Sequence, residues 1–223
     1  MKTIICIGDS HTCLFTGKII NVGTRHIVKY GDNYVFDCSR VPGNLGALAY
    51  HIGKPNRKNF IYNILSNYKN YKNNKNEVYV MFMFGESDCR QHIYKYIEKT
   101  NTTIEDNIKI VYNRYTEFIM EVYQNGFQNI IIWEILASSP SIDTIFLNKY
   151  SKGSTQERNK ITKIFNEMLF QFAKNNDFHY LKIFDIMVDE DLNTIVPEWF
   201  IDDVHLKKKC IIENYIKQFN LML

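Results

Sequence analysis

The sequence lacks the features that mark membrane, metal-binding and nucleic-acid-binding proteins. No stretch approaches the ~20 consecutive apolar residues that a membrane-spanning helix needs. No Cys/His pair has the spacing of a zinc site, so we expect no metal. The formal net charge of +3 is too small to indicate a surface for nucleic acid or anionic lipid. We therefore expect no nucleic-acid partner and no membrane partner.

The cysteines are also uninformative about disulfides. They are odd in number, scattered and without CxxC spacing, which is typical of reduced thiols in an intracellular protein, several of them in the core. The amino-terminal "MKTIICIGDSH" has only a few apolar residues before polar ones, so we expect no signal peptide. Both observations predict a cytoplasmic protein. The cysteines are Cys6, Cys13, Cys38, Cys89 and Cys210.

Four apolar stretches predict strands. The chain of 223 residues, 45% hydrophobic and 23% charged, is most simply one domain spanning residues 1–223. The first three stretches are near-continuous apolar runs, which a sheet covered on both faces requires. The four are "KTIICI" (2–7), "EVYVMFMF" (77–84), "NIIIWEIL" (129–136) and "YLKIFDI" (180–186).

Helical patterns lie between these strands. The helix expected at 103–126 begins at Thr103 and ends at Gly126, the helix expected at 154–176 repeats its apolar spacing, and a last helix is expected at about 206–219. Strand–helix alternation predicts a parallel, doubly wound α/β sheet. Between 19 and 62 the assignment stays open: "RHIVKYG" or "YVFDC" is a further strand, and "LGALAYHIG" is a helix. The Lys/Asn-rich "SNYKNYKNNKNE" (66–77) predicts a solvated loop.

The stretch "ICIGDSHTCLF" (5–15) carries the first candidate for catalysis. The apolar run stops at Gly8, where glycine permits a sharp turn or a close approach of the backbone. The following residues stand at the carboxyl end of a strand, where open α/β sheets place their ligands. Ser10 is therefore a candidate nucleophile. His11 either lines the cleft or caps the first helical turn, and we expect Asp9 to bind backbone amides of its own turn.

A serine nucleophile needs a base, and the best candidate among the histidines is His205 in "WFIDDVHLKKK". Asp202 lies three residues before His205, close to one helical or turn repeat, so both side chains can share a face. The carboxylate would then fix one ring nitrogen and leave the other free to face Ser10. Alone, a DxxH pattern is also what a surface histidine beside solvated acids looks like.

Together, "GDS" after the first strand and "DxxH" before the last helix resemble the outer blocks of the SGNH/GDSL hydrolase superfamily. "VPGNLGALAY" (41–50) and "MFGESDCR" (83–90) fall where its second and third blocks would fall. The resemblance implies a flavodoxin-like, three-layer α/β/α sandwich with a mainly parallel sheet. It also implies a triad in which Ser10 attacks, His205 is the base and Asp202 orients it. No cofactor is implied.

One block departs from the family pattern. The third block of the superfamily reads GxND, and its asparagine donates to the oxyanion, whereas this chain has "GESD" with Ser87 at that position. The oxyanion hole would then consist of the backbone N–H of Ser10, a second-block glycine and the Ser87 hydroxyl. We prefer Gly46 over Gly43 for the glycine, because Gly46 begins an expected helix. Loss of one donor typically costs ~10²–10³ in rate.

Charged residues near the third block are candidates for substrate binding. Arg90 could contact a substrate anion, with Glu86 and His92 beside it. A structural ion pair between Asp88 and Arg90 is the competing interpretation.

The resemblance makes a serine esterase the leading prediction. It would act on a small-molecule or carbohydrate ester, with an acetyl group on a carbohydrate as one candidate, through an acyl-enzyme on Ser10. An O-acyltransferase would use the same triad with a sugar hydroxyl in place of water. A non-catalytic glycan-binding domain of the same fold is the alternative from another class, and the missing asparagine is its main support.

Overall fold

The computed structural model describes residues 1–43, 48–69, 78–140, 151–202 and 204–223. Its centre is a six-stranded sheet in the order β2-β3-β1-β4-β5-β6, in which every neighbouring pair is parallel except β2 with β3. The expected α/β fold with a mainly parallel sheet is confirmed. The strands are β1 (Lys2–Gly8), β2 (Arg25–Tyr30), β3 (Tyr34–Arg40), β4 (Val78–Met83), β5 (Ile130–Trp133) and β6 (His179–Leu181).

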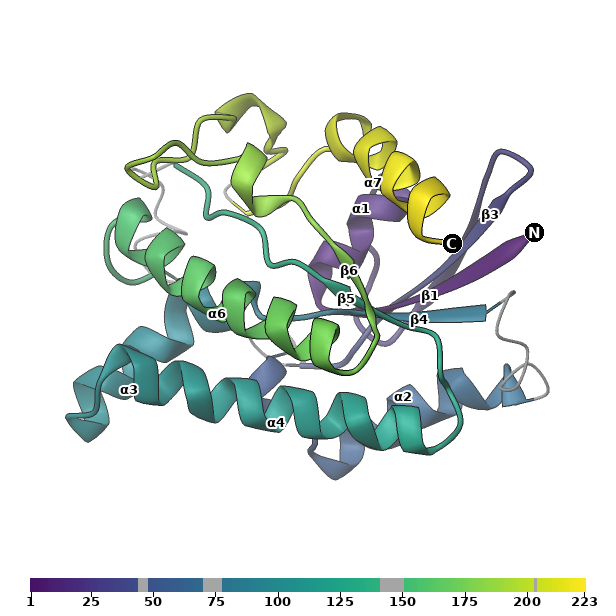
Figure 1. The fold of residues 1–223 in the computed structure, drawn as a ribbon, viewed down its shortest axis with the longest axis horizontal. Helices are drawn as coiled ribbons and strands as arrows, with labels where there is room; N and C mark the ends of the chain where they lie inside the picture. The colour runs from purple at the N-terminus through teal and green to yellow at the C-terminus, as the bar shows by residue number, and fades with distance from the viewer. Residues whose placement is uncertain (44–47, 70–77, 141–150, 203) are drawn as a thin grey trace.

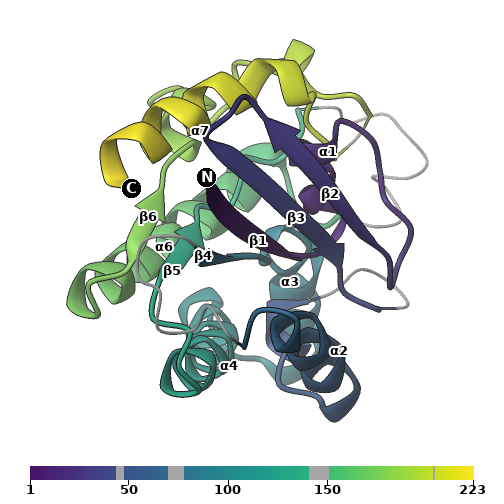
Figure 2. The same cartoon turned by 90° about the vertical axis from the view of Figure 1, so that its right-hand side faces the viewer.

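Helices cover both faces of this sheet (Figures 1 and 2). One face packs against α2, α3, α4 and α6, and the other against α1 and α7, which makes three layers. The α-helices are α1 (Cys13–Thr16), α2 (Pro55–Ser66), α3 (Ile93–Thr100), α4 (Ile104–Gln124), α6 (Thr155–Asn175) and α7 (Lys208–Met222). Shorter 3-10 turns are η1 (Ser10–Thr12), η2 (Ala49–His51), η5 (Phe184–Ile186) and η6 (Pro197–Trp199), and η4 (Asp88–His92) is a π-helix.

Alternation along the central strands explains why the apolar runs are continuous. In β1, Ile5 and Ile7 pack on the face of α2 and α4, while Ile4 and Cys6 pack on the face of α1 and α7. Because both faces are covered, neither face of the strand can carry polar residues. Cys6, Cys13, Cys38 and Cys89 are free and buried, as expected of reduced core thiols, whereas the side chain of Cys210 lies outside the described part of the chain.

The two long helices begin where their sequences predict. The Thr103 side chain accepts the backbone N–H of Asp106 at 3.1 Å and caps α4. At α6, Ser154 and Glu157 form a reciprocal capping box. The apolar faces predicted for both helices point into the core.

Residues 19–62, whose secondary structure the sequence left open, contain more regular structure than predicted. Both "RHIVKYG" and "YVFDC" are strands, β2 and β3, paired antiparallel as a hairpin. Of the helix expected at 45–53, only the 3-10 turn Ala49–His51 is seen, and residues 45–47 lie outside the described residues. Helices α2 and α3 were not predicted, and residues 70–77 of the expected loop are not described.

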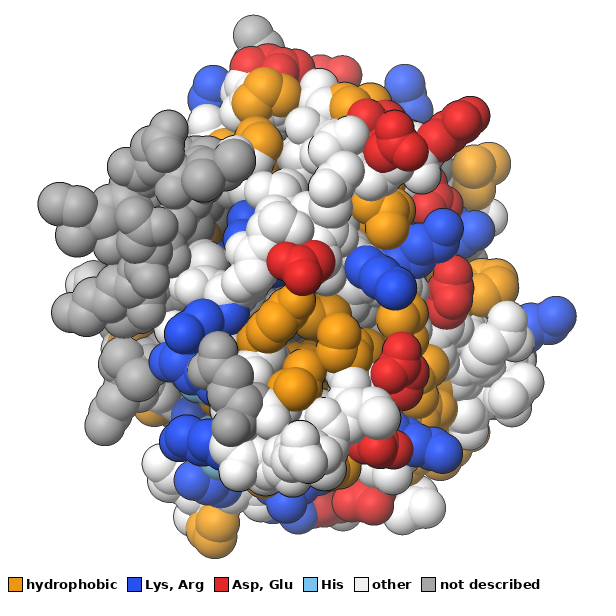
Figure 3. Space-filling model, turned by 90° about the vertical axis from the view of Figure 1, so that its left-hand side faces the viewer, with side chains coloured by type: hydrophobic (Ala, Val, Ile, Leu, Met, Phe, Trp, Pro, Cys, Tyr) orange, Lys and Arg blue, Asp and Glu red, His pale blue; other side chains and the backbone are white. Residues whose placement is uncertain are grey.

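The carboxyl ends of the parallel strands point toward the left of Figure 1, and Figure 3 shows the molecule from that side. Hydrophobic side chains gather in the middle of this face, with basic and acidic side chains around them. Among the described residues, no helix is both long and apolar enough to cross a membrane.

Candidate active site

The Ser10 turn is set by a close approach between two strands. A Cβ atom on Gly8 would lie 2.3 Å from the carbonyl oxygen of Met83 on the neighbouring strand β4, so only glycine fits there. The next residue, Asp9, donates its backbone N–H to the same oxygen at 3.1 Å. Ser10 opens η1 and is half-buried, whereas Asp9 and His11 on either side are buried. Ser10 is thus the side chain in this turn that reaches solvent.

Asp202 holds His205 in one orientation. The Asp202 carboxylate accepts the ring Nδ1–H of His205 at 2.8 Å and 3.0 Å, and also accepts the backbone N–H groups of Val204 (2.9 Å) and His205 (2.8 Å). With Nδ1 as donor, Nε2 of the neutral ring is the free acceptor. This Nε2 is buried and has no hydrogen-bond partner among the described residues.

The surroundings keep both groups in the states that a base and its orienting acid require. Partial burial opposes ionisation of Asp202, but the hydrogen bonds from Val204 and His205 outweigh it and lower the pKa of Asp202. Burial lowers the pKa of His205, and the nearby charge of His11 lowers it further, against the opposite effect of Asp202. His205 is therefore neutral at pH 7.

The turn that follows β1 and the turn that precedes α7 meet at this place. The His11 ring lies 5.4 Å from the His205 ring, and His11 Nε2 contacts the carbonyl oxygen of Val204 at 3.1 Å. The turn of Ser10 and the turn of His205 are therefore adjacent, with no hydrogen bond from Ser10 to His205 Nε2. Such bonds are often loose in the absence of substrate and tighten as it binds.

Of the residues expected for the oxyanion hole, only some lie in the described part of the chain. Gly46 lies outside the described residues, and Gly43 is half-buried. Ser87 is buried, and its hydroxyl donates a long hydrogen bond of 3.4 Å to Glu86.

Glu86 and Arg90 are paired with each other. Arg90 Nε lies 2.6 Å from Glu86 Oε1, and Nη2 lies 3.3 Å from Oε2, with both side chains buried. Burial opposes the charge on Glu86, but Arg90 and His11 outweigh it and lower the pKa of Glu86. Both side chains, predicted to bind substrate, are thus largely committed to an internal ion pair.

The competing interpretation, an ion pair between Asp88 and Arg90, is right about an ion pair but wrong in its acidic partner. Glu86 stands four residues before Arg90 and shares its helical face, whereas Asp88 points elsewhere. The Asp88 carboxylate accepts the backbone N–H groups of Ala49 (2.8 Å) and Tyr50 (3.3 Å) and so anchors η2. Burial raises the pKa of Asp88 to about 7.

His92 lies near His51 of η2. Burial and the charges of Lys95, His51 and Arg90 lower its pKa to about 4. Its Nε2 is buried, and no described residue forms a hydrogen bond with it. The described part of the chain contains no group of three or more His, Cys, Asp or Glu side chains that could hold a metal ion.

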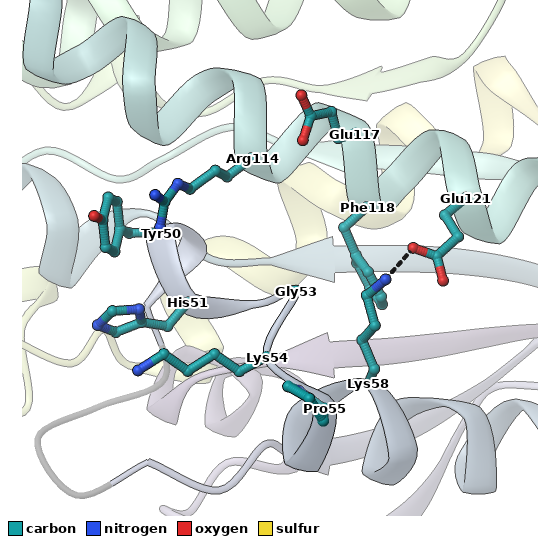
Figure 4. A pocket seen from close by; sticks show the side chains of 10 residues that line it. All are labelled: Tyr50, His51, Gly53, Lys54, Pro55, Lys58, Arg114, Glu117, Phe118 and Glu121. Atoms are coloured by element: carbon teal, nitrogen blue, oxygen red, sulfur yellow. Dashed lines mark hydrogen bonds and ion pairs between the residues drawn. The ribbon is translucent and has the colours of Figure 1, made fainter.

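A surface pocket of about 430 Å³ lies elsewhere, between η2, the start of α2 and α4 (Figure 4). Arg114 reaches from α4 over the ring of Tyr50, with its guanidinium carbon 3.9 Å from the ring centroid. Lys58 and Glu121 form an ion pair at the other end. None of the residues predicted for catalysis lines this pocket.

Sequence reasoning missed the contact between His11 and Val204. Asp9 does bind the backbone N–H of His11 at 2.9 Å, as predicted for its own turn, but the same oxygen also contacts His11 Nδ1 at 2.9 Å. No local pattern signals the second contact of His11, because its partner lies 193 positions along the chain.

Comparisons with known proteins bear on the fold. No protein-family model matches the sequence, and no curated protein matches it. Among solved structures, a GDSL-like lipase from Bacteroides thetaiotaomicron is 16% identical with a TM-score of 0.55, and the match covers 98% of this chain and 87% of that chain. An acetylxylan esterase from Geobacillus stearothermophilus is 11% identical with a TM-score of 0.54, covering 97% of this chain and 93% of that chain. The chain therefore has the fold of the SGNH/GDSL hydrolases.

Proposed function

We propose that this chain is a serine esterase with Ser10 as nucleophile, His205 as base and Asp202 as its orienting acid. One observation carries the proposal: the His205 imidazole is fixed by the Asp202 carboxylate, and its turn lies beside the Ser10 turn at the end of β1. Its Nε2 is buried and has no hydrogen-bond partner in the described part of the chain. This is the arrangement that activates a hydroxyl at neutral pH.

The chemistry would run as acyl transfer to Ser10. His205 Nε2 takes the Ser10 proton as Oγ attacks the ester carbonyl carbon. The tetrahedral intermediate collapses, the C–O bond to the alcohol breaks, and the alcohol leaves with the proton from Nε2. Water, deprotonated by the same nitrogen, then attacks the acyl carbon, the bond from that carbon to Ser10 Oγ breaks, and Oγ takes the proton back from Nε2 as the acid is released. The backbone N–H of Ser10 at the start of η1 would stabilise the oxyanion, together with the Ser87 hydroxyl and Gly46.

The substrate class is proposed from the structural neighbours. One of them is an acetylxylan esterase, and a catalytic mutant of that esterase with a serine replaced by alanine also matches this chain at a TM-score of 0.52. These similarities support an acetyl ester on a carbohydrate as the substrate and a serine as the reacting group.

The test combines turnover with covalent labelling. Wild type, Ser10→Ala and a control Ser66→Ala, altered at the exposed end of α2, are incubated with a chromogenic acetyl ester, with acetylated xylo-oligosaccharides and with a fluorophosphonate. We expect wild type and Ser66→Ala to release acetate and to gain one label, located at Ser10 by peptide mass spectrometry. The proposal fails if Ser10→Ala hydrolyses and labels as well as wild type.

A further inference from the structure

Both ring nitrogens of His11 contact atoms that can only accept hydrogen bonds. Nδ1 lies 2.9 Å from the Asp9 carboxylate, and Nε2 lies 3.1 Å from the carbonyl oxygen of Val204. A neutral imidazole has one N–H and would leave one of these contacts as a repulsion between two acceptors. With the side chain only 3% exposed, water cannot relieve that repulsion. The geometry therefore requires a proton on each nitrogen.

The charge that follows is supported by its neighbours. Burial alone would lower the pKa of His11, but the Asp9 and Glu86 carboxylates outweigh it and raise the pKa to about 9. The ring also lies 5.9 Å from the ring of Trp133 at the end of β5, which contributes no charge.

The position of this ring links the two halves of the proposed site. His11 directly follows Ser10, and its carbonyl partner Val204 directly precedes His205. The link is direct, from a side chain of one turn to the backbone of the other.

We propose that His11 is a positioning residue, a buried imidazolium that fastens the Ser10 turn to the His205 turn and disfavours a second proton on His205. This inference rests on the proposed esterase function and names a residue that supports its triad. His11 does not contact the reacting atoms, because both of its nitrogens are engaged elsewhere.

The charges that face His11 come from three segments. Asp9 belongs to its own turn, Glu86 with its partner Arg90 follows β4, and Asp202 with His205 belongs to the carboxyl-terminal turn. Loss of the His11 charge removes a repulsion felt by His205 while Asp202 and Glu86 stay in place. The pKa of His205 then rises.

The first measurement needs no turnover. In the full-length protein, ¹⁵N and ¹H spectra of the imidazoles are recorded between pH 5 and pH 10. We expect His11 to carry both ring protons at pH 7 and to lose one near pH 9, and His205 to titrate below its ordinary value of about 6.5. A neutral His11 at pH 7 would overturn the proposal.

The second measurement compares His11→Gln with a control, His179→Gln, at the first position of the edge strand β6. In His11→Gln we expect the His205 titration and the acid limb of kcat/KM to move up by roughly half a pH unit or more, since two charges at this distance interact strongly in a buried site. We also expect kcat to fall at least about tenfold with KM changed little, as misplacement of a catalytic group predicts. His179→Gln should leave both unchanged.

Asp9→Asn serves where His11→Gln fails to fold. It keeps the ring but removes its carboxylate, so we expect the pKa of His11 to fall and kcat to fall with it. If His11→Gln or Asp9→Asn folds and leaves both the His205 titration and kcat unchanged, His11 is only structural and the proposal is refuted. Failure of the esterase assignment looks different, because it would appear as unaltered turnover in Ser10→Ala while the imidazole titrations stay as expected.

Discussion

The contact between Gly8 and β4 offers the sharpest test of how the fold places Ser10. In Gly8→Ala the new methyl group would lie 2.3 Å from the Met83 carbonyl oxygen and 2.7 Å from Met83 Cβ. These atoms belong to the backbone and the base of a side chain in a central strand, so they cannot rotate away. The strands must separate, and the Asp9–Met83 hydrogen bond must lengthen from 3.1 Å.

The expected cost follows from this geometry. Overpacking in a well-packed core typically costs ~1–3 kcal/mol, and a clash with backbone atoms lies at the upper end, so we expect about 3 kcal/mol. For a protein of this size that corresponds to a fall in Tm of about 6–12 °C. Because Ser10 follows two positions later, kcat/KM should fall further than the loss of folded protein explains.

Urea unfolding and thermal melting of Gly8→Ala and of Gly53→Ala check this reasoning. Gly53 is a matched control, because its added Cβ would meet nothing closer than the flexible Lys58 side chain at 3.8 Å. We expect Gly53→Ala to change the free energy of unfolding by less than about 1 kcal/mol. A Gly8→Ala variant as stable as wild type, or equal losses in both variants, would show that the strand contact does not constrain position 8.

Three further predictions concern single side chains. Asp202→Asn should lower kcat by about 10³-fold or more, because the amide no longer fixes the His205 tautomer; esterase assays check this, and near-normal turnover would contradict it. Asp88 keeps its proton in the folded protein up to about pH 7, well above its unfolded pKa of about 3.9, so its contribution to stability is lost as the pH rises through that window. The free energy of unfolding of Asp88→Asn, measured by denaturant titration, should therefore rise relative to that of wild type as the pH increases from 5 to 8. If the difference between the two proteins stays constant over this range, the prediction is refuted. Tyr215→Phe removes the acceptor of the Trp133 Nε1–H hydrogen bond (2.8 Å) and should lower the free energy of unfolding by about 1–3 kcal/mol, as urea titrations would measure. In a variant whose Trp133 is already replaced, the same substitution should cost less, because no donor is then left unpaired.

The central strands and the two long helices could be predicted because their signals are local. A strand buried on both faces needs an unbroken apolar run, and β1, β4 and β5 are fully or largely buried along their length. Helices α4 and α6 carry regular apolar spacing and strong caps at Thr103 and Ser154.

Helix α2 was missed because its buried face is weakly apolar. That face includes the arginine Arg57 beside Ile61, Ile64 and Leu65, so no clear periodicity marks it. The choice between β2 and β3 stayed open because β2 alternates half-buried with exposed positions and pairs on one side only. Short polar strands at an edge have little signal of their own.

The candidate site divides in the same way. The Asp202–His205 contact joins residues three apart, so their spacing allows it, and the resemblance to the superfamily blocks singled it out. Spacing also favours Glu86, four residues before Arg90, over Asp88, two residues before it, but the competing interpretation paired Arg90 with Asp88. The contact of His11 with Val204 depends on the folded path of the whole chain, and no pattern within either segment specifies it.

The two edge strands of the sheet, β2 and β6, have features that disfavour aggregation of the protein. A border strand presents unpaired amide and carbonyl groups that another chain can adopt as a template. Here β6 has only 3 residues, and the outer strand β2 alternates the charged Arg25 and Lys29 with a single exposed isoleucine, Ile27. Neither edge strand therefore exposes a long, flat, apolar stretch to which another chain could pair. The short length of β6 and the charged side chains of β2 both disfavour edge-to-edge association into fibrils.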